Sequence, residues 1–444
     1  MRLTVFKNTV LLFVLIGFSC GSKSQSEALN SSLETTDTSK QPVVVGANQI
    51  DDYLNLLKGK HVGIVANQSS VIFKQHQDSI FEGYPDGTFA FSHMEQKPVV
   101  ASHLVDSLLR LNINVSIVFA PEHGFRGIAD AGEHIKNDVD SKTGLPIASL
   151  YGDHKKPKLK RLTKTETNKN DATTNETSID LMIFDLQDVG ARFYTYISTL
   201  HYVMEACAEA QIPLIVLDRP NPNGHYIDGP ILDMTHHSFV GMHPIPVVYG
   251  MTIGEYAQMI NGEGWLTNGI QCDLTVIPLK NYTHQTPYDL PIKPSPNLPN
   301  AKAVNLYPSL CFFEGTNVSA GRGTSKQFQI YGSPYLRKDV YTFKFIPSPN
   351  EGAKYPKHDN ILCYGEDLST LKRLEQLDLS YLIKAYNNTL DQDHFFNDFF
   401  IKLAGTSQLQ QQIEQGLSEA QIRASWQSGL TAFKSIRAKY LLYD

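Results

Sequence analysis

Residues 114–133 read NVSIVFAPEHGFRGIADAGE, and this stretch decides the fold. Its first part, VSIVFA at 115–120, is a nearly unbroken apolar run, which is typical of a strand buried on both faces of a parallel sheet. Pro121 then ends the strand, and Glu122 opens a loop punctuated by glycine and rich in ionisable groups. Because open α/β sheets bind ligands at the carboxyl ends of their strands, this loop predicts a functional site.

The rest of the first half repeats an alternation of apolar strand, polar loop and helix. Strand-length apolar runs occur at 61–66, 179–186, 212–217 and 272–279, and helical spacing of apolar residues occurs at 97–112 and 195–211. A further helix is expected to begin at Thr252, where Glu255 stands in the capping-box position. This order predicts an α/β fold with a Rossmann-like parallel sheet in the N-terminal domain.

A proline cluster at 287–299, PYDLPIKPSPNLP, is the best candidate for a domain boundary. We therefore predict a Rossmann-like catalytic domain at 42–286 and a smaller α+β C-terminal domain at 287–444. Helical patterns in the second domain lie near 368–390, 395–404, 407–417 and 419–440.

Residues 1–20 read as an export signal, with a positively charged start, an apolar stretch at 10–18, and Ser19 before Cys20. This pattern resembles a bacterial lipoprotein cleavage site. It predicts a lipid on Cys20 that anchors the protein to a bacterial membrane, facing the periplasm or the cell surface. The alternative is a soluble secreted protein that loses Cys20 with its signal. The polar residues 21–41 predict a flexible linker.

Composition and missing motifs exclude several classes of function. The formal net charge of −6 and the sequence pI near 6.2 argue against a nucleic-acid partner. The motifs HExxH, GxxxxGK[ST] and GxGxxG after a strand are absent, and His123 has no second histidine at metal-site spacing. We therefore predict neither a metal nor a cofactor. The cysteines after Cys20 are widely spaced and are expected to be mostly buried thiols.

Carboxylates and arginines gather in the polar loops. The carboxylates are Glu122, Glu133, Asp188 and Glu314, and the arginines near them in sequence are Arg126, Arg192 and Arg322. Glycoside hydrolysis commonly needs one protonated carboxyl group to release the leaving oxygen and a second carboxylate opposite it. Glu122 is the best candidate for the acid, because it directly follows a buried strand, where partial desolvation favours the protonated form.

These charged residues also have structural alternatives. Glu122 could cap a helix or pair with Arg126, and Asp188 could form a turn. Arg192 and Arg322 could be partners in structural ion pairs. The sequence alone leaves both interpretations open.

Eight motifs follow one another along the chain. They are FAPEHGFRG at 119–127, AGE at 131–133, SLYG at 149–152, FDLQDVGARFYTY at 184–196, DRPNPNG at 218–224, VYGMTIGE at 248–255, PSPNLP at 294–299 and FEGTNVSAGRGT at 313–324. In these motifs the chain resembles the NamZ-type exo-β-N-acetylmuramidases, a family formerly known as a domain of unknown function. The resemblance implies a Rossmann-like domain and a smaller C-terminal domain with the pocket between them, which agrees with the boundary predicted above.

The resemblance also implies a reaction, the release of non-reducing terminal N-acetylmuramic acid (MurNAc) from peptidoglycan fragments during cell-wall recycling. The glutamate of the PEHG motif is Glu122, the implied catalytic acid, and we infer Asp188 as its partner. MurNAc carries a lactyl carboxylate, so its recognition calls for a cation, which Arg192 or Arg322 could supply. The candidate substrate-binding residues are His123, Arg126, Glu133, Arg192, Tyr194, Glu314, Asn317 and Arg322.

Two other classes of function remain open at the level of sequence. A non-catalytic peptidoglycan-binding lipoprotein would use the same arginines for affinity, and a metal-dependent cell-wall amidase would be inhibited by a chelator. For the glycosidase, the stereochemical outcome depends on the separation of the carboxyl groups, and a route assisted by the 2-acetamido group of the substrate is a further alternative.

Overall fold

The computed structural model describes residues 41–444 except 84–88, 127–136 and 162–176, and it gives 75–83, 89–98 and 101 as backbone only. Glu133, Cys20 and the rest of the predicted export signal lie outside the described residues. Within the described part, no helix combines the length and the apolar character needed to cross a membrane.

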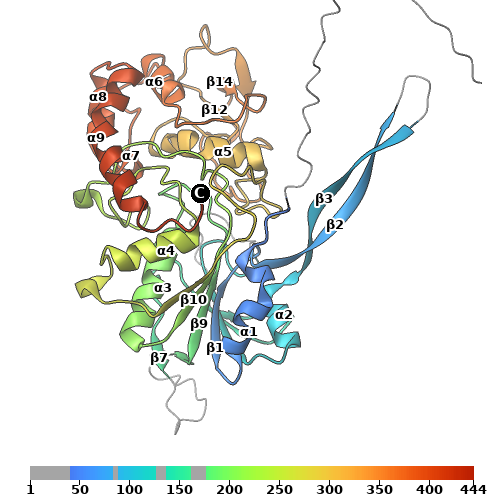
Figure 1. The fold of residues 1–444 in the computed structure, drawn as a ribbon. Coiled ribbons are helices and arrows are strands. Elements are labelled where there is room, and N and C mark those ends of the chain that lie inside the picture. Colours follow the sequence, from blue (N-terminus) through green and yellow to red (C-terminus); the bar gives the residue numbers. More distant parts are fainter. Residues whose placement is uncertain (1–40, 84–88, 127–136, 162–176) are drawn as a thin grey trace, which may run out of the picture. The chain divides into compact units, whose positions relative to one another are not determined.

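A seven-stranded sheet organises the first part of the chain, with the strand order β11-β10-β9-β1-β4-β6-β5 (Figure 1). Its strands are β1 (Val62–Ala66), β4 (Val115–Ala120), β5 (Asp138–Val139), β6 (Pro146–Ser149), β9 (Leu181–Asp185), β10 (Leu214–Leu217) and β11 (Leu274–Ile277). All neighbouring pairs run parallel except β5 and β6. The predicted α/β fold with a parallel sheet is therefore confirmed.

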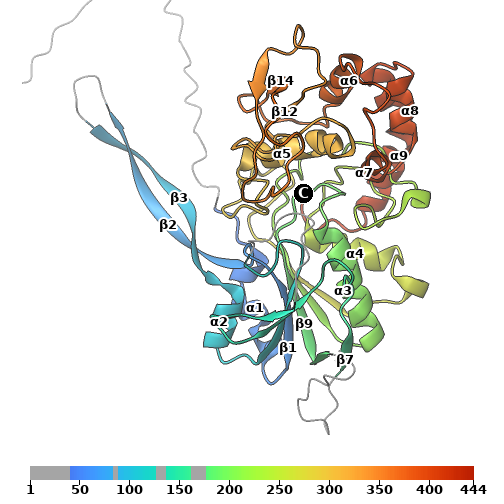
Figure 2. The ribbon, with the colours of Figure 1, turned by 180° about the vertical axis from the view of Figure 1, so that it is seen from behind.

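Each central strand sends alternate residues into one of two hydrophobic cores, because successive side chains of a strand point to opposite faces. Val65, Phe119, Phe184 and Val216 belong to the core that includes buried residues of α3 (Tyr196–Ala210) and α4 (Ile253–Gly262). Ile64, Val118, Ile183 and Ile215 belong to the core that includes α1 (Ile50–Leu57) and α2 (Leu104–Arg110). Figures 1 and 2 show the two helix pairs on opposite faces of the sheet.

The strand order reverses at β1. The chain passes from β1 to β4 on one side, and β9 then pairs with β1 on the other side. At such a reversal the loops after neighbouring strands diverge and leave a crevice at the carboxyl edge of the sheet. Asn67 follows β1, Glu122 follows β4 and Asp185 ends β9, so this edge collects polar residues from three strands.

A buried ion pair ties two loops together at this edge. The Arg219 guanidinium donates to both carboxylate oxygens of Asp185, with N–O distances of 2.6 and 2.9 Å, and its Nη2 also donates to the carbonyl of Val71 at 3.1 Å. The two side chains are 2% and 0% exposed. The pair therefore joins the end of β9 to the loop after β10 without access to solvent.

The second part of the chain is helical around a small sheet. Its helices are α5 (Ala301–Leu310), α6 (Ser380–Asn387), α7 (Phe399–Ala404), α8 (Gln408–Glu414) and α9 (Glu419–Arg437), and its antiparallel sheet has the order β12 (Ile330–Ser333), β14 (Cys363–Asp367), β13 (Phe343–Phe345). Residues 41–444 cluster as one compact unit, and one hydrophobic core includes residues from both parts. The boundary at 287–299 stays a prediction.

The remaining elements are short. They are β7 (Leu159–Arg161) paired with β8 (Thr177–Ile179), and the 3-10 helices η1 (Gly46–Asn48), η2 (Met234–His236), η3 (Thr267–Gly269) and η4 (Cys311–Gly315). The predicted capping box of α4 is present, since Thr252 and Glu255 each accept a hydrogen bond from the backbone of the other. Cys207, Cys272, Cys311 and Cys363 are free and buried, as predicted.

The helix predictions that differ most from the structure are those at 97–112 and 368–390. Of the residues at 97–112, only Leu104–Arg110 form α2, and the first residues belong to β3 (Phe89–His103), which pairs with β2 (Val71–Gly83) in a long hairpin. Pro98 and the β-branched residues Val99 and Val100 favour extended backbone there. Of the residues at 368–390, only Ser380–Asn387 are helical.

Replacing Arg219 with Met is expected to lower the free energy of unfolding by about 3–5 kcal/mol, because Asp185 would remain as a buried carboxylate without its partner. Urea unfolding followed by circular dichroism measures the change. Arg337→Met is the matched control, since Arg337 pairs with Asp339 at the surface, and its midpoint should stay close to that of the wild type. Equal midpoints for the two variants would contradict the structural role of the pair.

Candidate active site

A pocket of about 300 Å³ contains residues from both parts of the chain. It is lined by Glu122, His123, Tyr151, Phe193, Tyr194, Thr195, Phe239, Val240, Ser295, Asn297, Leu298, Tyr307, Cys311, Glu314, Arg322, Phe328, Phe399 and Leu403. This volume is at the lower end of the range of roughly 300–1,000 Å³ found for small-molecule sites. Five of the sequence-predicted site residues meet here: Glu122, His123, Tyr194, Glu314 and Arg322.

Glu122 enters the pocket from the carboxyl end of β4 because the chain turns sharply after it. His123 and Gly124 both have a left-handed backbone, with φ of 73° and 77°, and the Gly124 amide donates to the carbonyl of Pro121 at 3.0 Å. A positive φ is uncommon for a residue other than glycine and concentrates at functional sites. His123 is only 4% exposed and lines the pocket beside Glu122.

Two hydroxyl groups hold the Glu122 carboxylate. Thr195 Oγ1 donates to Glu122 Oε2 at 2.8 Å. The Tyr151 hydroxyl bonds to the same carboxylate, and burial together with this carboxylate raises the pKa of Tyr151. The Glu122 side chain is thus half-buried and fixed in direction, as a group that must transfer a proton at one atom requires.

The pocket lining also includes an ion pair. Arg322 Nη1 lies 3.1 Å from Glu314 Oε2, and Arg322 Nη2 donates to the carbonyl of Gly352 at 3.0 Å. Tyr307 lines the same pocket, and its pKa is raised by burial first and then by Cys311, Glu314 and Glu122. The pocket lining therefore combines the Glu122 carboxylate with a cation that is paired with a second carboxylate.

Tyr194 forms part of the pocket wall. Its hydroxyl donates to the carbonyl of Pro294 at 2.9 Å, and burial raises its pKa well above the usual value. The side chain thereby links the loop before α3 to the proline-rich segment 287–299. We interpret its role as structural support for the pocket.

Asp188 is buried outside the residues that line the pocket, with 5% of its surface exposed. Its Oδ2 accepts from the backbone of Gly190 at 2.7 Å and from the hydroxyl of Tyr249. Burial raises the pKa of Asp188 to about 7, although these hydrogen bonds oppose the shift. These contacts fit the alternative in which Asp188 forms a turn. The position of Asp188 does not support the role of catalytic partner.

Arg192 is fully buried and binds backbone carbonyls. Its Nη1 donates to Pro230 and Ile245 at 2.8 and 2.7 Å, and its Nη2 donates to Leu403 and Ala404 at 3.0 and 2.7 Å. Burial lowers the pKa of Arg192 to about 9. The guanidinium thus joins the segment before α4 to the end of α7, and its position does not support recognition of a substrate carboxylate.

Arg126 and Asn317 also lie outside the pocket lining. Arg126 donates to both carboxylate oxygens of Asp140 at 3.1 and 2.7 Å, and it lines a separate cleft at the base of the β2–β3 hairpin. The Asn317 carbonyl accepts from His358 Nε2 at 2.7 Å. Glu133 falls outside the described residues, so its predicted role stays a prediction.

Several pocket residues were not predicted from the sequence. Tyr151, Thr195, Asn297 and Tyr307 carry hydroxyl or amide groups. The first three stand in motifs that the sequence analysis singled out, SLYG, FYTY and PSPNLP. A search for charged side chains does not find these residues, because their polar groups are neutral near pH 7.

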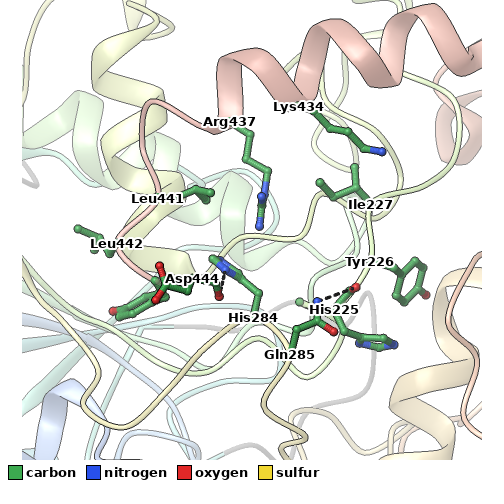
Figure 3. Close-up of a pocket in the computed structure, with 12 residues that line it drawn as sticks. His225, Tyr226, Ile227, His284, Gln285, Lys434, Arg437, Leu441, Leu442 and Asp444 are labelled. Atoms are coloured by element: carbon green, nitrogen blue, oxygen red, sulfur yellow. Dashed lines mark hydrogen bonds between the residues drawn. The ribbon is translucent and has the colours of Figure 1, made fainter.

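A larger cavity, of about 690 Å³, lies beside helix α9, and Figure 3 shows the residues that line it. Lys434 and Arg437 extend from that helix toward it, and His284 is hydrogen-bonded to the backbone oxygen of Asp444 at 3.0 Å. None of the predicted site residues that the structure describes lines this cavity. Across the described ranges, no group of three or more His, Cys, Asp or Glu side chains is placed to hold a metal ion.

Two buried histidines join α3 to the segment before α4. His201 Nδ1 lies 2.9 Å from His243 Nε2, and His243 Nδ1 lies 2.7 Å from the Tyr256 hydroxyl. Because a hydrogen bond between two ring nitrogens uses one proton, the pair is satisfied only when at least one ring is neutral. Ser198 also donates to the carbonyl of Phe239 at 2.7 Å, so α3 anchors the segment that supplies Phe239 and Val240 to the pocket.

Comparison with known proteins gives matches along most of the chain. The family model described as Exo-beta-N-acetylmuramidase NamZ, N-terminal, matches residues 97–302, and the C-terminal model of the same name matches residues 305–443. The chain is 36% identical over 430 residues to a Bacillus subtilis (strain 168) protein named Peptidoglycan beta-N-acetylmuramidase NamZ. This match covers 91% of the chain and 93% of that protein.

Two crystal structures of DUF1343 family proteins from Bacteroides fragilis NCTC 9343 are similar to the chain. The first has a TM-score of 0.74 and 44% identity, and covers 91% of this chain and 99% of its own. The second has a TM-score of 0.69 and 25% identity, and covers 90% of this chain and 99% of its own. The architecture described above is therefore shared with experimentally determined structures.

The contribution of His201 and His243 to stability is expected to fall as the pH falls from about 6.5 to about 4, because burial lowers the pKa of His201 to about 4 and that of His243 well below its usual value. The unfolded chain then binds protons that the folded chain excludes, and His201 alone accounts for roughly 3 kcal/mol across this interval. Buried Asp188, whose pKa is raised to about 7, changes stability in the opposite direction, so the contribution of the histidines is measured by comparing variants. Unfolding midpoints at a series of pH values measure the effect. The stability of His201→Gln relative to the wild type should increase as the pH falls through this interval, and that of the surface control His394→Gln should change much less. Equal changes in the two variants would contradict the assignment.

Proposed function

Because the chain belongs to the NamZ family of exo-β-N-acetylmuramidases, and is thereby a glycoside hydrolase, we propose that it releases non-reducing terminal MurNAc by acid–base chemistry in the pocket around Glu122. The substrate is a peptidoglycan fragment that ends in MurNAc. One observation carries this proposal: Glu122 shares a single pocket with the Glu314–Arg322 pair, although these residues stand far apart in the sequence.

Glu122 is the proposed general acid. Cleavage of a glycosidic bond needs a carboxyl group that donates a proton to the leaving oxygen as the bond breaks. Thr195 and Tyr151 support this role, because their hydroxyl groups fix the direction of the carboxyl group. After departure of the leaving group, the same carboxylate can accept a proton from the incoming water.

Arg322 is the proposed partner of the lactyl carboxylate. It is the arginine that lines the pocket, whereas Arg192 and Arg126 are engaged elsewhere. A guanidinium group binds a carboxylate through two parallel hydrogen bonds, which gives direction as well as affinity. Glu314 would hold the guanidinium in position through its existing contact. Comparing the affinities of Arg322→Met and wild type for free MurNAc and free GlcNAc tests this role, since only the affinity for MurNAc should fall.

The group that faces the acid across the sugar is proposed to be Glu314 or the 2-acetamido group of the substrate. Glu314 is the second carboxylate that lines the pocket among the residues described, and N-acetyl sugars permit assisted cleavage. A nuclear magnetic resonance measurement of the first product anomer distinguishes retention from inversion, and inversion would exclude the acetamido route.

Glu122→Gln is expected to lower kcat/KM for a chromogenic MurNAc glycoside by roughly 10²–10⁴-fold, because glutamine cannot donate the proton. The release of the chromophore measures turnover directly. Glu375→Gln, at a side chain that is 74% exposed, is the control and should match the wild type. Undiminished turnover in Glu122→Gln would remove the proposed acid, and a wild type that binds MurNAc without releasing it would favour a binding protein instead.

We further propose that the protein is exported and tethered to a bacterial membrane by a lipid on Cys20, facing the periplasm. The charged start, the apolar stretch and the Ser19-Cys20 pair support this location. Metabolic labelling of cells with an alkynyl fatty acid should label the wild type and leave Cys20→Ser unlabelled. Equal labelling of the two proteins, or none in the wild type, would contradict the lipid anchor.

A further inference from the structure

A loop outside the pocket lining is hydrogen-bonded to the lining residues Asn297 and Arg322 and to the segment that carries Glu314. This loop, residues 346–358, contributes none of the lining residues itself. We propose that Lys357 is a positioning residue for MurNAc recognition: from behind the wall it fixes the segment that carries Glu314 and thereby the direction of Arg322. The inference rests on the function proposed above and adds a residue to it.

The first step concerns backbone carbonyls. Glu314 lies in the short helix η4 beside Phe313, whose carbonyl also accepts hydrogen bonds from the backbone amide and the hydroxyl group of Thr316. Lys357 Nζ donates to the carbonyls of Phe313 at 3.0 Å and Val318 at 3.2 Å, and also to the carbonyl of Thr316. An ammonium group has three N–H bonds, so these three acceptors use all of them. Lys357 is therefore bound to the protein rather than directed at a ligand.

The next residue along the chain contacts the same segment. His358 Nε2 lies 2.7 Å from the carbonyl of Asn317, which falls between two of the carbonyls that Lys357 binds. His358 has a left-handed backbone with φ of 60°. Such a conformation costs free energy in a residue other than glycine and persists where surrounding contacts impose it. Two consecutive side chains thus hold the segment 313–318 from behind.

The same loop also holds Arg322 directly. The carbonyl of Gly352 accepts from Arg322 Nη2 at 3.0 Å and from Asn297 Nδ2 at 2.6 Å. Gly352 has φ of 86°, and a Cβ atom there would lie 2.6 Å from Cβ of Pro296, so only glycine fits this position. A displacement of the loop would therefore move the guanidinium as well as the Glu314 segment.

The charge of Lys357 acts on the same two side chains. Glu314, Arg322 and His358 are the titratable groups that face it among the residues described. Burial lowers the pKa of Lys357 to about 8, with Glu314 opposing the shift and Arg322 adding to it. As the pH rises through about 8, the ammonium group loses one N–H donor and its attraction for Glu314. Recognition of MurNAc should weaken over this interval.

The test compares three variants across pH 6–10 on a chromogenic MurNAc glycoside. Lys357→Met is expected to raise KM about 10–100-fold with a smaller change in kcat, because the hydrogen bonds from a charged donor are lost. It should also lack the alkaline rise in KM near pH 8. Lys357→Arg keeps its charge at this pH, so the rise should disappear while KM at pH 7 stays nearer the wild type. Lys338→Met, at an exposed lysine, is the control, and it should keep the KM of the wild type at pH 7 and its rise in KM near pH 8.

Each outcome bears on the proposal. If Lys357→Met keeps the KM and the alkaline rise of Lys338→Met, the positioning role is overturned. If Lys357→Met does not fold, Lys357→Arg decides. A rise in KM that persists near pH 8 in Lys357→Arg also overturns the positioning role. A wild type that releases no MurNAc would refute the proposed function and this inference with it. Turnover by the wild type with no effect of either Lys357 variant would refute this inference alone.

Discussion

Burial of β1 on both faces is the constraint on which the rest of the structure depends. All five residues of this strand are buried, and it pairs with β4 on one side and β9 on the other. A strand enclosed in this way has no place for an unpaired charge, so ionisable groups are displaced to the loops at its end. The carboxyl edge of the sheet is the place where polar residues from three neighbouring strands meet, and Glu122 reaches the pocket from there.

The cations around the pocket differ in their hydrogen-bond partners. This difference distinguishes cations that support the structure from a cation that could bind a ligand. Arg192 and Lys357 are surrounded by backbone carbonyls, which are neutral acceptors that hold a buried cation in place. Arg322 instead contacts a carboxylate and lines the pocket, where a second carboxylate from a ligand could approach it. Charge alone does not distinguish these roles, because the surroundings of each side chain decide them.

Much of the fold, but less of the site, could be predicted from the sequence. The apolar runs of β4 and β9 identify buried strands because burial on both faces leaves a continuous signal. Glu122 could be found because it directly follows such a run. The roles inferred for Asp188 and Arg192 rested on charge within a loop, and a sequence does not show that Tyr249 and four distant carbonyls enclose them. The hairpin of β2 and β3 escaped prediction because the apolar spacing near residue 100 also fits a helix.

The four thiols described above have a practical consequence for handling the protein. Cys207, Cys272, Cys311 and Cys363 are buried without disulfides, and burial raises the pKa of each thiol, so little thiolate is present at neutral pH. A maleimide dye, which reacts with exposed thiolate, would therefore spare them. One cysteine introduced at an exposed position in a variant without Cys20 would give a single attachment point for a fluorophore, with the native cysteines left in place.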